Sequence, residues 1–274
     1  MNTLYISDLD GTLLNSCAEL SDFTKKSLSQ LIDRGVLFTV ATARTKATVK
    51  DIFSGVGLNL PFILMNGVLI YDPITDKNIS SNEIASEDVN SVLSAYRKFG
   101  KTPMLYILRK DHLEIQYKSL DNIYQEEYIA ARNSLRDKRF KKCDSEFEFS
   151  DEDKVIYMVS LDKEDILAPI CEEIRAEDRV YCAFYSDNYT DCNFMECMNK
   201  KVSKGVAASQ LKALLNIDKI VAFGDNLNDL PLFYVADESY AVSNACEQLK
   251  EVATGVIDSN DNDGVVKFII DRIK

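Results

Sequence analysis

The strongest limit on the fold of this chain is an alternation of short apolar strand patterns with amphipathic helix patterns at both ends of the sequence. Near the start, Leu4-Tyr5-Ile6 forms a strand pattern, Ser21 is placed to cap a helix, and residues 36–41 form a buried strand pattern. The alternation resumes from about Asn193, with a strand pattern at 219–223 and helix patterns at 202–214, 228–234 and 265–273. Strands joined through helices make parallel sheets by right-handed crossovers. We therefore predict an α/β fold with a Rossmann-like parallel-sheet core.

One short segment of this core departs from the alternation. Pro61 introduces an apolar run at 62–65, and Asn66-Gly67 separates that run from the next one. An Asn-Gly pair between two apolar runs is a strong signal for a two-residue β-hairpin. The sequence therefore predicts a hairpin at this point.

The middle of the chain has a different character, because strands there follow one another as hairpins as well as alternating with helices. Helix patterns cover 86–99, 120–136 and 163–175, and strand patterns cover 104–108, 113–117, 155–161 and 180–185. Such a mixture favours a separate α+β domain with a largely antiparallel sheet. A length of 274 residues also fits two domains, at roughly 150 residues each. We predict a discontinuous core, 1–82 and 190–274, interrupted by an inserted α+β domain at 83–189.

The charge balance excludes several kinds of partner. Against 44 Asp and Glu residues the chain has 32 Lys and Arg, which gives a formal net charge of −12. Nucleic acids and anionic membrane surfaces need a cationic footprint, so neither is an expected partner. A small anionic substrate remains compatible with this charge if local cations or a metal ion receive it. The sequence does not indicate an oligomeric state.

Cysteine and histidine usage excludes further classes of site. The seven cysteines are an odd count with no C-x-x-C pair, which disfavours a disulfide framework and a zinc cluster. The single histidine, His112, excludes the metalloproteases that bind zinc through H-E-x-x-H. No apolar stretch approaches the ~18 residues of a membrane span. We expect a protein of the reducing cytoplasm.

The motif Asp8-Leu9-Asp10-Gly11-Thr12 comes directly after the first strand pattern. In an open α/β sheet, ligands bind outside the carboxyl ends of the strands, where these residues must lie. Two carboxylates in this spacing suit a shared metal ion, or a nucleophile with an acid/base partner. The alternative is a plain polar exit from a strand, where Asp and Gly are common.

A second acidic motif, Gly224-Asp225-Asn226-Leu227-Asn228-Asp229, follows the apolar run at 220–223. Its carboxylate and amide oxygens suit a hard cation such as Mg²⁺. The alternative is that Asp225 and Asn226 only cap the following helix.

Two smaller signals accompany these motifs. Ala41-Thr42-Ala43-Arg44 ends the second strand pattern, where a hydroxyl and backbone N–H groups suit a phosphate oxygen. Lys204-Gly205 stands at the start of a helix pattern, where an ammonium group meets an anion held above the sheet. Taken separately, each is an everyday structural residue. Four segments far apart in the sequence nevertheless place polar groups at one edge of the same predicted sheet.

These segments together make the chain resemble the haloacid dehalogenase-like phosphatase superfamily, and within it the Cof-type sugar-phosphatase-like group with a large inserted cap. They occur, with Asn66-Gly67, in the family's order and with family-like spacing across both core segments. The inserted segment resembles the family's cap in size and pattern only. One departure is Ala43, where these proteins usually have glycine between the threonine and the arginine.

The resemblance implies a role for each motif. Asp8 is the expected nucleophile, which forms an aspartyl-phosphate, and Asp10 is the expected acid/base. The implied cofactor is Mg²⁺, held by Asp8, the main-chain carbonyl of Asp10 and Asp225, with Asp229 in support. The implied phosphate-binding groups are those of Thr42, Lys204 and Asn228.

The activity implied is that of a phosphoric monoester hydrolase, a Mg²⁺-dependent phosphatase of a small phosphorylated metabolite such as a sugar phosphate. Two alternatives stay open: a phosphomutase of the same superfamily, and a protein that binds a phosphorylated ligand without turnover. We also expect the inserted domain to choose among substrates, with Tyr185, Asp187, Asn188 and Tyr189 as candidate contacts.

A last motif, Asp258-Ser259-Asn260-Asp261-Asn262, begins like a calcium-binding loop. Its sixth and twelfth positions are Asp263 and Ile269, where such a loop needs glycine and glutamate. We expect a polar turn before the last helix.

Overall fold

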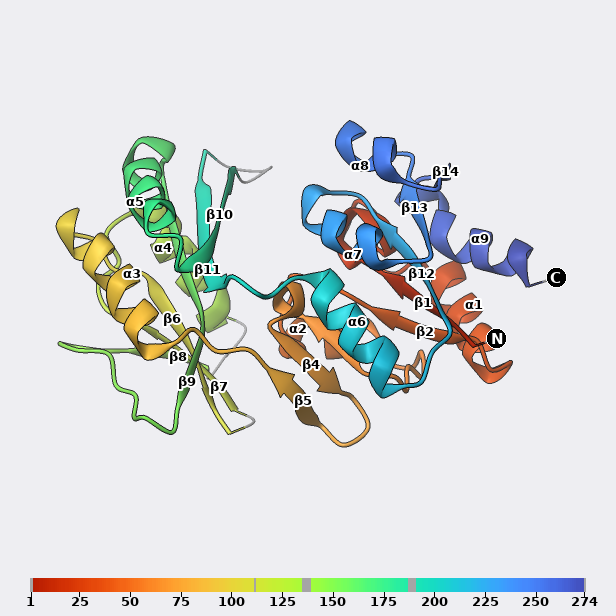
Figure 1. Cartoon of the computed structure of the whole chain (residues 1–274), viewed down its shortest axis with the longest axis horizontal. Helices are drawn as coiled ribbons and strands as arrows, with labels where there is room; N and C mark the ends of the chain where they lie inside the picture. Colours follow the sequence, from red (N-terminus) through yellow and green to blue (C-terminus); the bar gives the residue numbers. More distant parts are fainter. Residues whose placement is uncertain (1, 111, 135–138, 187–190, 274) are drawn as a thin grey trace. The chain divides into compact units, whose positions relative to one another are not determined.

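The computed structural model describes residues 2–110, 112–134, 139–186 and 191–273 (Figure 1). The chain divides into two compact units. The first unit consists of Met1–Ser81 and Val202–Lys274, and the second consists of Asn82–Lys201. Among the described residues, no helix is both long and apolar enough to cross a membrane.

The first unit is built on a parallel sheet of five strands in the order β14-β13-β12-β1-β2. Its strands are β1 (Thr3–Ser7), β2 (Leu37–Val40), β12 (Lys219–Gly224), β13 (Glu238–Val242) and β14 (Gly255–Ile257). The central strands are apolar on both faces, and Leu4, Ile6, Ile220 and Val221 are fully buried. Burial on both faces is typical of parallel sheets, since crossover helices cover them. The predicted Rossmann-like core is confirmed.

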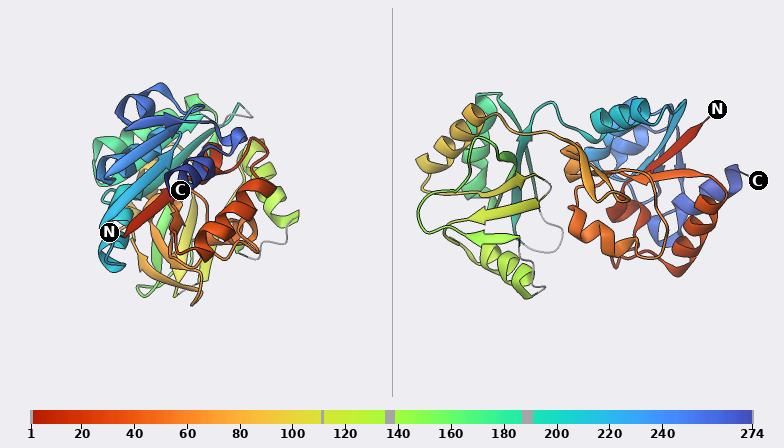
Figure 2. Two further views of the ribbon diagram at one scale, coloured as in Figure 1. Left: turned by 90° about the vertical axis from the view of Figure 1, so that its right-hand side faces the viewer. Right: turned by 90° about the horizontal axis from the view of Figure 1, so that it is seen from below.

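Helices cover both faces of this sheet, and α1 packs against α9 while α6 packs against α7 (Figure 2). The helices of the unit are α1 (Asp22–Asp33), α2 (Lys46–Ile52), α6 (Lys204–Leu214), α7 (Leu230–Val235), α8 (Glu247–Val252) and α9 (Gly264–Arg272). The helix start predicted at Ser21 is confirmed, and a second helix starts with a proline. Ser21 caps α1 by accepting a hydrogen bond from the Thr24 backbone N–H, and Pro231 lies in the first turn of α7.

A small antiparallel sheet, β3-β4-β5, completes the first unit. It consists of β3 (Phe62–Leu64), β4 (Leu69–Asp72) and β5 (Lys77–Ser81). The predicted hairpin between β3 and β4 is present, but the two-residue turn is wrong, since pairing ends at Leu64 and Leu69 and leaves four residues between them. Gly67, at φ +99°, packs so closely on the main chain of Ser203 that an added Cβ would lie 2.3 Å from its carbonyl oxygen. Contact with the start of α6 therefore shapes this turn, rather than hairpin geometry alone.

The second unit is the predicted α+β arrangement. Its six-stranded sheet runs β10-β11-β9-β6-β7-β8, and every pairing is antiparallel except β7 with β8. Helices α3 and α5 share one apolar core with the sheet, which includes Tyr96, Leu105, Met158 and Ile170. The strands are β6 (Met104–Arg109), β7 (His112–Tyr117), β8 (Phe140–Lys142), β9 (Lys154–Asp162), β10 (Val180–Ser186) and β11 (Asn193–Asn199), and the helices are α3 (Ser86–Lys98), α4 (Ile123–Ser134) and α5 (Glu164–Ala176).

The boundary at which the chain returns to the core differs from the prediction. The sequence assigned everything from residue 190 to the core, but β11 pairs with β10 and β9 in the second unit, which extends to Lys201. The strand pattern of β11 indicates a strand without showing which sheet receives it. The candidate contacts Asp187, Asn188 and Tyr189 lie outside the described residues. Residue 189 is also the predicted end of the inserted domain.

Candidate active site

The first acidic motif follows β1 at the carboxyl edge of the parallel sheet. Strands β1 and β12 are neighbours in register, with Ser7 opposite Phe223, so the chain leaves both strands at the same level. The Asp8 backbone N–H continues the ladder by donating to the Phe223 carbonyl over 3.0 Å. This pairing places Asp8 beside the second acidic motif, although more than 200 residues separate them in the sequence.

Lys204 joins the two acidic motifs. Its Nζ lies 2.8 Å from Asp8 Oδ1 and 2.7 Å from Asp229 Oδ1, and its side chain is completely buried. Burial by itself lowers the pKa of a lysine, but the negative charges of Asp229 and Asp8 outweigh it, and the pKa of Lys204 is raised. Lys204 therefore carries a fixed positive charge in contact with Asp8.

Asp229 combines a structural and an electrostatic role. Its Oδ2 accepts hydrogen bonds from the backbone N–H groups of Asp225 and Asn226, over 3.0 and 3.2 Å, while its Oδ1 accepts from Lys204. Asn226 caps the turn that these bonds enclose. Of the two residues in the capping alternative, Asn226 does cap, whereas the Asp225 carboxylate accepts from the Thr12 hydroxyl and lies next to Asp8.

Asp225 completes a group of three carboxylates. One ligand oxygen from each of Asp8, Asp225 and Asp229 lies within 4.8 Å of the other two. Asp225 Oδ1 also accepts a 2.9 Å hydrogen bond from the hydroxyl of Thr12. Gly11 makes room for Asp225, because at φ +74° an added Cβ would lie 2.5 Å from Asp225 Oδ2.

The three carboxylates carry more negative charge than the ammonium group of Lys204 compensates. Burial and the nearby charge of Asp229 raise the pKa of Asp225 to about 6. Burial likewise raises the pKa of Asp8 well above its usual range, against the lowering effect of Lys204. One ammonium group faces three carboxylates, so a divalent cation with oxygen ligands would compensate the remaining charge. The donor set is the all-oxygen type that Mg²⁺ takes.

The side chain of Asp10 lies apart from this group. Its two carboxylate oxygens accept hydrogen bonds from Nε and an Nη of Arg44, over 2.7 and 2.6 Å, and about half of the side chain is exposed. This ion pair raises the pKa of Arg44. The sequence pointed to Arg44 as part of a motif without giving it a role, and only the fold shows that it holds Asp10.

The remaining predicted residues, Thr42 and Asn228, come from neighbouring segments. Thr42 follows β2, is fully buried, and its Oγ1 accepts a 3.1 Å hydrogen bond from the Arg44 backbone N–H. Asn228 donates from Nδ2 to Oδ1 of Asn66 over 3.2 Å. Asn66 thus lies beside Asn228, a predicted phosphate-binding residue. The backbone φ of Asn66 is positive, at 55°.

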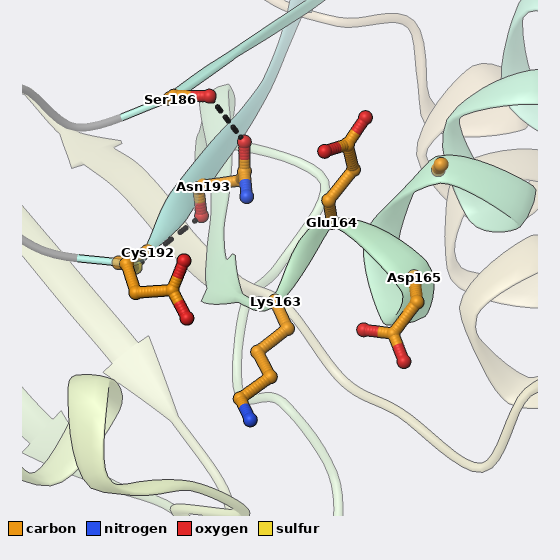
Figure 3. Close-up of a pocket in the computed structure, with 8 residues that line it drawn as sticks. Lys163, Glu164, Asp165, Ser186, Cys192 and Asn193 are labelled. Atoms are coloured by element: carbon orange, nitrogen blue, oxygen red, sulfur yellow. Dashed lines mark hydrogen bonds between the residues drawn. The ribbon is translucent and has the colours of Figure 1, made fainter.

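A separate cavity of about 580 Å³ lies in the second unit, at the start of α5 (Figure 3). None of the predicted site residues lines it. Its wall combines Lys163 with the carboxylates of Glu164, Asp165 and Asp191, and a 2.9 Å hydrogen bond from Ser186 Oγ to Asn193 Oδ1 crosses one side. Its mixed, mainly acidic lining does not resemble the lysine-centred group of the first unit.

Comparison with known proteins identifies the family. The family model for haloacid dehalogenase-like hydrolases matches residues 5–269. The chain belongs to this family. The resemblance predicted from the motifs is therefore confirmed, and with it the hydrolase class.

Solved structures support the fold of this hydrolase over its full length. A haloacid dehalogenase-like hydrolase from Bacteroides thetaiotaomicron superposes with a TM-score of 0.79 at 22% identity, covering 100% of both chains. Another from B. subtilis superposes with a TM-score of 0.77 at 23% identity, covering 98% of this chain and 99% of the other.

Curated relatives of this hydrolase are named as phosphatases. YwtE of Bacillus subtilis, a 5-amino-6-(5-phospho-D-ribitylamino)uracil phosphatase, is 26% identical over 96% of this chain and 95% of its own. The phosphatase YwpJ of the same organism is 27% identical over 96% of each chain. These names agree with the predicted phosphoric monoester hydrolase.

Proposed function

We propose that this hydrolase is a Mg²⁺-dependent phosphatase of a small phosphorylated metabolite. The observation that carries the proposal is the buried contact of Lys204 with Asp8, in a group with two further carboxylates at the carboxyl edge of the sheet. A nucleophilic carboxylate repels a phosphoryl dianion, so such a reaction needs fixed positive charge beside the nucleophile. Lys204 supplies one such charge, and a cation held by Asp8, the Asp10 carbonyl, Asp225 and Asp229 is the proposed second.

Each step is assigned to a residue of this chain. Lys204 orients Asp8 by holding its Oδ1. Asp8 attacks phosphorus, the bond from phosphorus to the leaving oxygen breaks, and the leaving oxygen takes a proton from Asp10. Asp10 then removes a proton from water, which attacks the aspartyl-phosphate and releases inorganic phosphate and free Asp8. Bound Mg²⁺ would supply Lewis-acid stabilisation of the charge on the phosphoryl oxygens.

Arg44 holds Asp10 as a carboxylate in this structure, so Asp10 must exchange this contact for a proton before it can protonate the leaving oxygen. The two hydrogen bonds from the Arg44 guanidinium fix the carboxylate in one orientation, outside the three-carboxylate group and partly exposed. Thr42 and Asn228 are proposed to bind the remaining phosphoryl oxygens.

The proposed substrate is a phosphorylated polyhydroxy metabolite such as a sugar phosphate. Two relatives from B. subtilis, YwtE and YcsE, are named for a substrate with a phosphorylated ribityl chain. That compound therefore belongs beside sugar phosphates among the candidates.

The test is release of inorganic phosphate across a panel of sugar phosphates, phosphorylated polyols and p-nitrophenyl phosphate, with Mg²⁺ and after chelation. The proposal predicts steady, Mg²⁺-dependent release from at least one metabolite, with Asp8→Asn as the inactive control. Transfer of the phosphoryl group to a second position without release would indicate a mutase. Absence of turnover for every compound, p-nitrophenyl phosphate included, would contradict the proposal.

A further inference from the structure

A second polar network reaches the Asp8–Thr12 loop from the C-terminal part of the first unit. Asn244, which follows β13, donates from its side-chain Nδ2 to the carbonyl oxygen of Gly11 over 2.8 Å. Its Oδ1 accepts from the backbone N–H of Asn260 over 3.1 Å. A backbone N–H only donates, so this bond fixes the orientation of the amide and leaves Nδ2 facing Gly11.

The polar turn at 258–263 supports the same loop at further points. Asn260 Nδ2 donates to the Leu14 carbonyl over 2.9 Å, and Asp261 Oδ1 accepts from the Ser16 backbone N–H over 2.8 Å. Asp263 accepts from the hydroxyls of Ser21 and Thr24 at the start of α1. Three side chains of this turn, those of Asn260, Asp261 and Asp263, thus form hydrogen bonds with the chain that follows β1.

The peptide that Asn244 holds is central to the site. It joins Gly11 to Thr12, and the hydroxyl of Thr12 orients Asp225. Gly11 also packs against the Asp225 carboxylate more closely than any residue with a Cβ allows. A rotation of this peptide would therefore displace both the hydrogen bond and the packing surface that hold Asp225.

We propose that Asn244 is a positioning residue: it fixes the Gly11–Thr12 peptide and, through Thr12, the Asp225 carboxylate that binds the divalent cation. It touches neither substrate nor the reacting atoms. Its effect on turnover rests on the proposed function, whereas its effect on the loop does not. Outer partners of metal ligands typically change metal affinity by about 10–100-fold when removed, and we expect an effect of that order for Asn244.

The sharpest variant is Asn244→Asp, because it keeps the shape and the acceptor for Asn260 but replaces the donor with an oxygen that repels the Gly11 carbonyl. The matched control is Asn216→Asp, since Asn216 is also exposed and lies between the end of α6 and the start of β12, at the edge of the sheet opposite the site. Both variants add one negative charge. Added negative charge near the site by itself strengthens cation binding, so a purely electrostatic effect has the opposite sign to the one expected here.

Three measurements on the full chain test whether Asn244 positions the loop and the Asp225 carboxylate. Asn244→Asp should speed hydrogen exchange of the backbone amides at 9–16, weaken Mg²⁺ binding in calorimetry by roughly tenfold or more, and lower kcat more than it raises KM. Asn216→Asp should leave all three near wild type. The changes in Mg²⁺ affinity caused by Asn244→Ala and Thr12→Val should also be non-additive in the double variant, because the two side chains act in one chain of contacts.

Equal loop exchange and equal Mg²⁺ affinity in the two Asp variants would overturn the assignment, and so would full additivity with Thr12→Val. These outcomes are separable from failure of the proposed function. If the wild type releases no phosphate or binds no Mg²⁺, hydrogen exchange at 9–16 still shows whether Asn244 holds the loop.

Discussion

Replacement of Lys204 by methionine tests the electrostatic core of the site. Lys204→Met keeps most of the apolar stem but removes an ammonium group that is wholly buried and contacts both Asp8 and Asp229. Loss of one partner from a buried, hydrogen-bonded charge pair typically costs about 3–5 kcal/mol, since the other charge stays buried without compensation. We expect a loss of that order in the free energy of unfolding of the first unit at neutral pH without metal.

The matched control lies on the same helix. Lys212 pairs with Asp237 over 2.9 Å, but both side chains are about a third exposed, and exposed pairs contribute about 0–1 kcal/mol. Urea unfolding of Lys204→Met and Lys212→Met, followed by circular dichroism in a chelator, measures both effects. The difference should shrink at acid pH, where protonation of the carboxylates removes their repulsion. A cost for Lys204→Met no larger than that for Lys212→Met would refute the reasoning.

The remaining predictions use other groups and other assays. Asp10→Asn should lower turnover by about 10²–10⁴ for a sugar phosphate but by less for p-nitrophenyl phosphate, whose leaving group needs little protonation; equal losses would argue against an acid at this position. Activity should need Mg²⁺ and be poorly supported by Ca²⁺, which takes more and longer bonds to carboxylates; equal initial rates with the two ions would contradict this. Hydrogen bonds, first of all from Arg272, lower the pKa of Glu238, so its stabilisation is present above the usual carboxyl pKa and disappears as the pH falls through the lowered value. Glu238→Gln should therefore cost about 1–3 kcal/mol at pH 7 and less in acid, and a pH-independent difference in thermal unfolding would contradict the assignment.

The sequence predicts most of the site because of how parallel sheets are made. Asp8 and Asp225 each come directly after an apolar strand, and the carboxyl ends of adjacent parallel strands meet at one edge. The periodicity of the flanking segments indicates those strands and the edge at which both motifs lie, whereas only the fold shows that β1 and β12 are neighbours. The position of Lys204 is predictable for a similar reason, because its helix begins near the same edge.

Contacts formed by side chains across loops are not predictable in this way. The pairing of Arg44 with Asp10, and of Asn244 with Gly11, depends on loop conformations that no periodicity encodes. The same limit explains the boundary error at β11, since an alternating pattern specifies a strand but leaves the choice of sheet to long-range packing.

The central claim is that Asp8 becomes covalently phosphorylated during turnover. Acid quenching of the enzyme during turnover of its best substrate, reduction with borohydride and mass spectrometry of the N-terminal peptide test it directly, because reduction of an aspartyl-phosphate leaves homoserine at that position. The account predicts homoserine at position 8 in the wild type and none in Asp8→Asn. Reduction at a different carboxylate, or sustained phosphate release by Asp8→Asn, would contradict it.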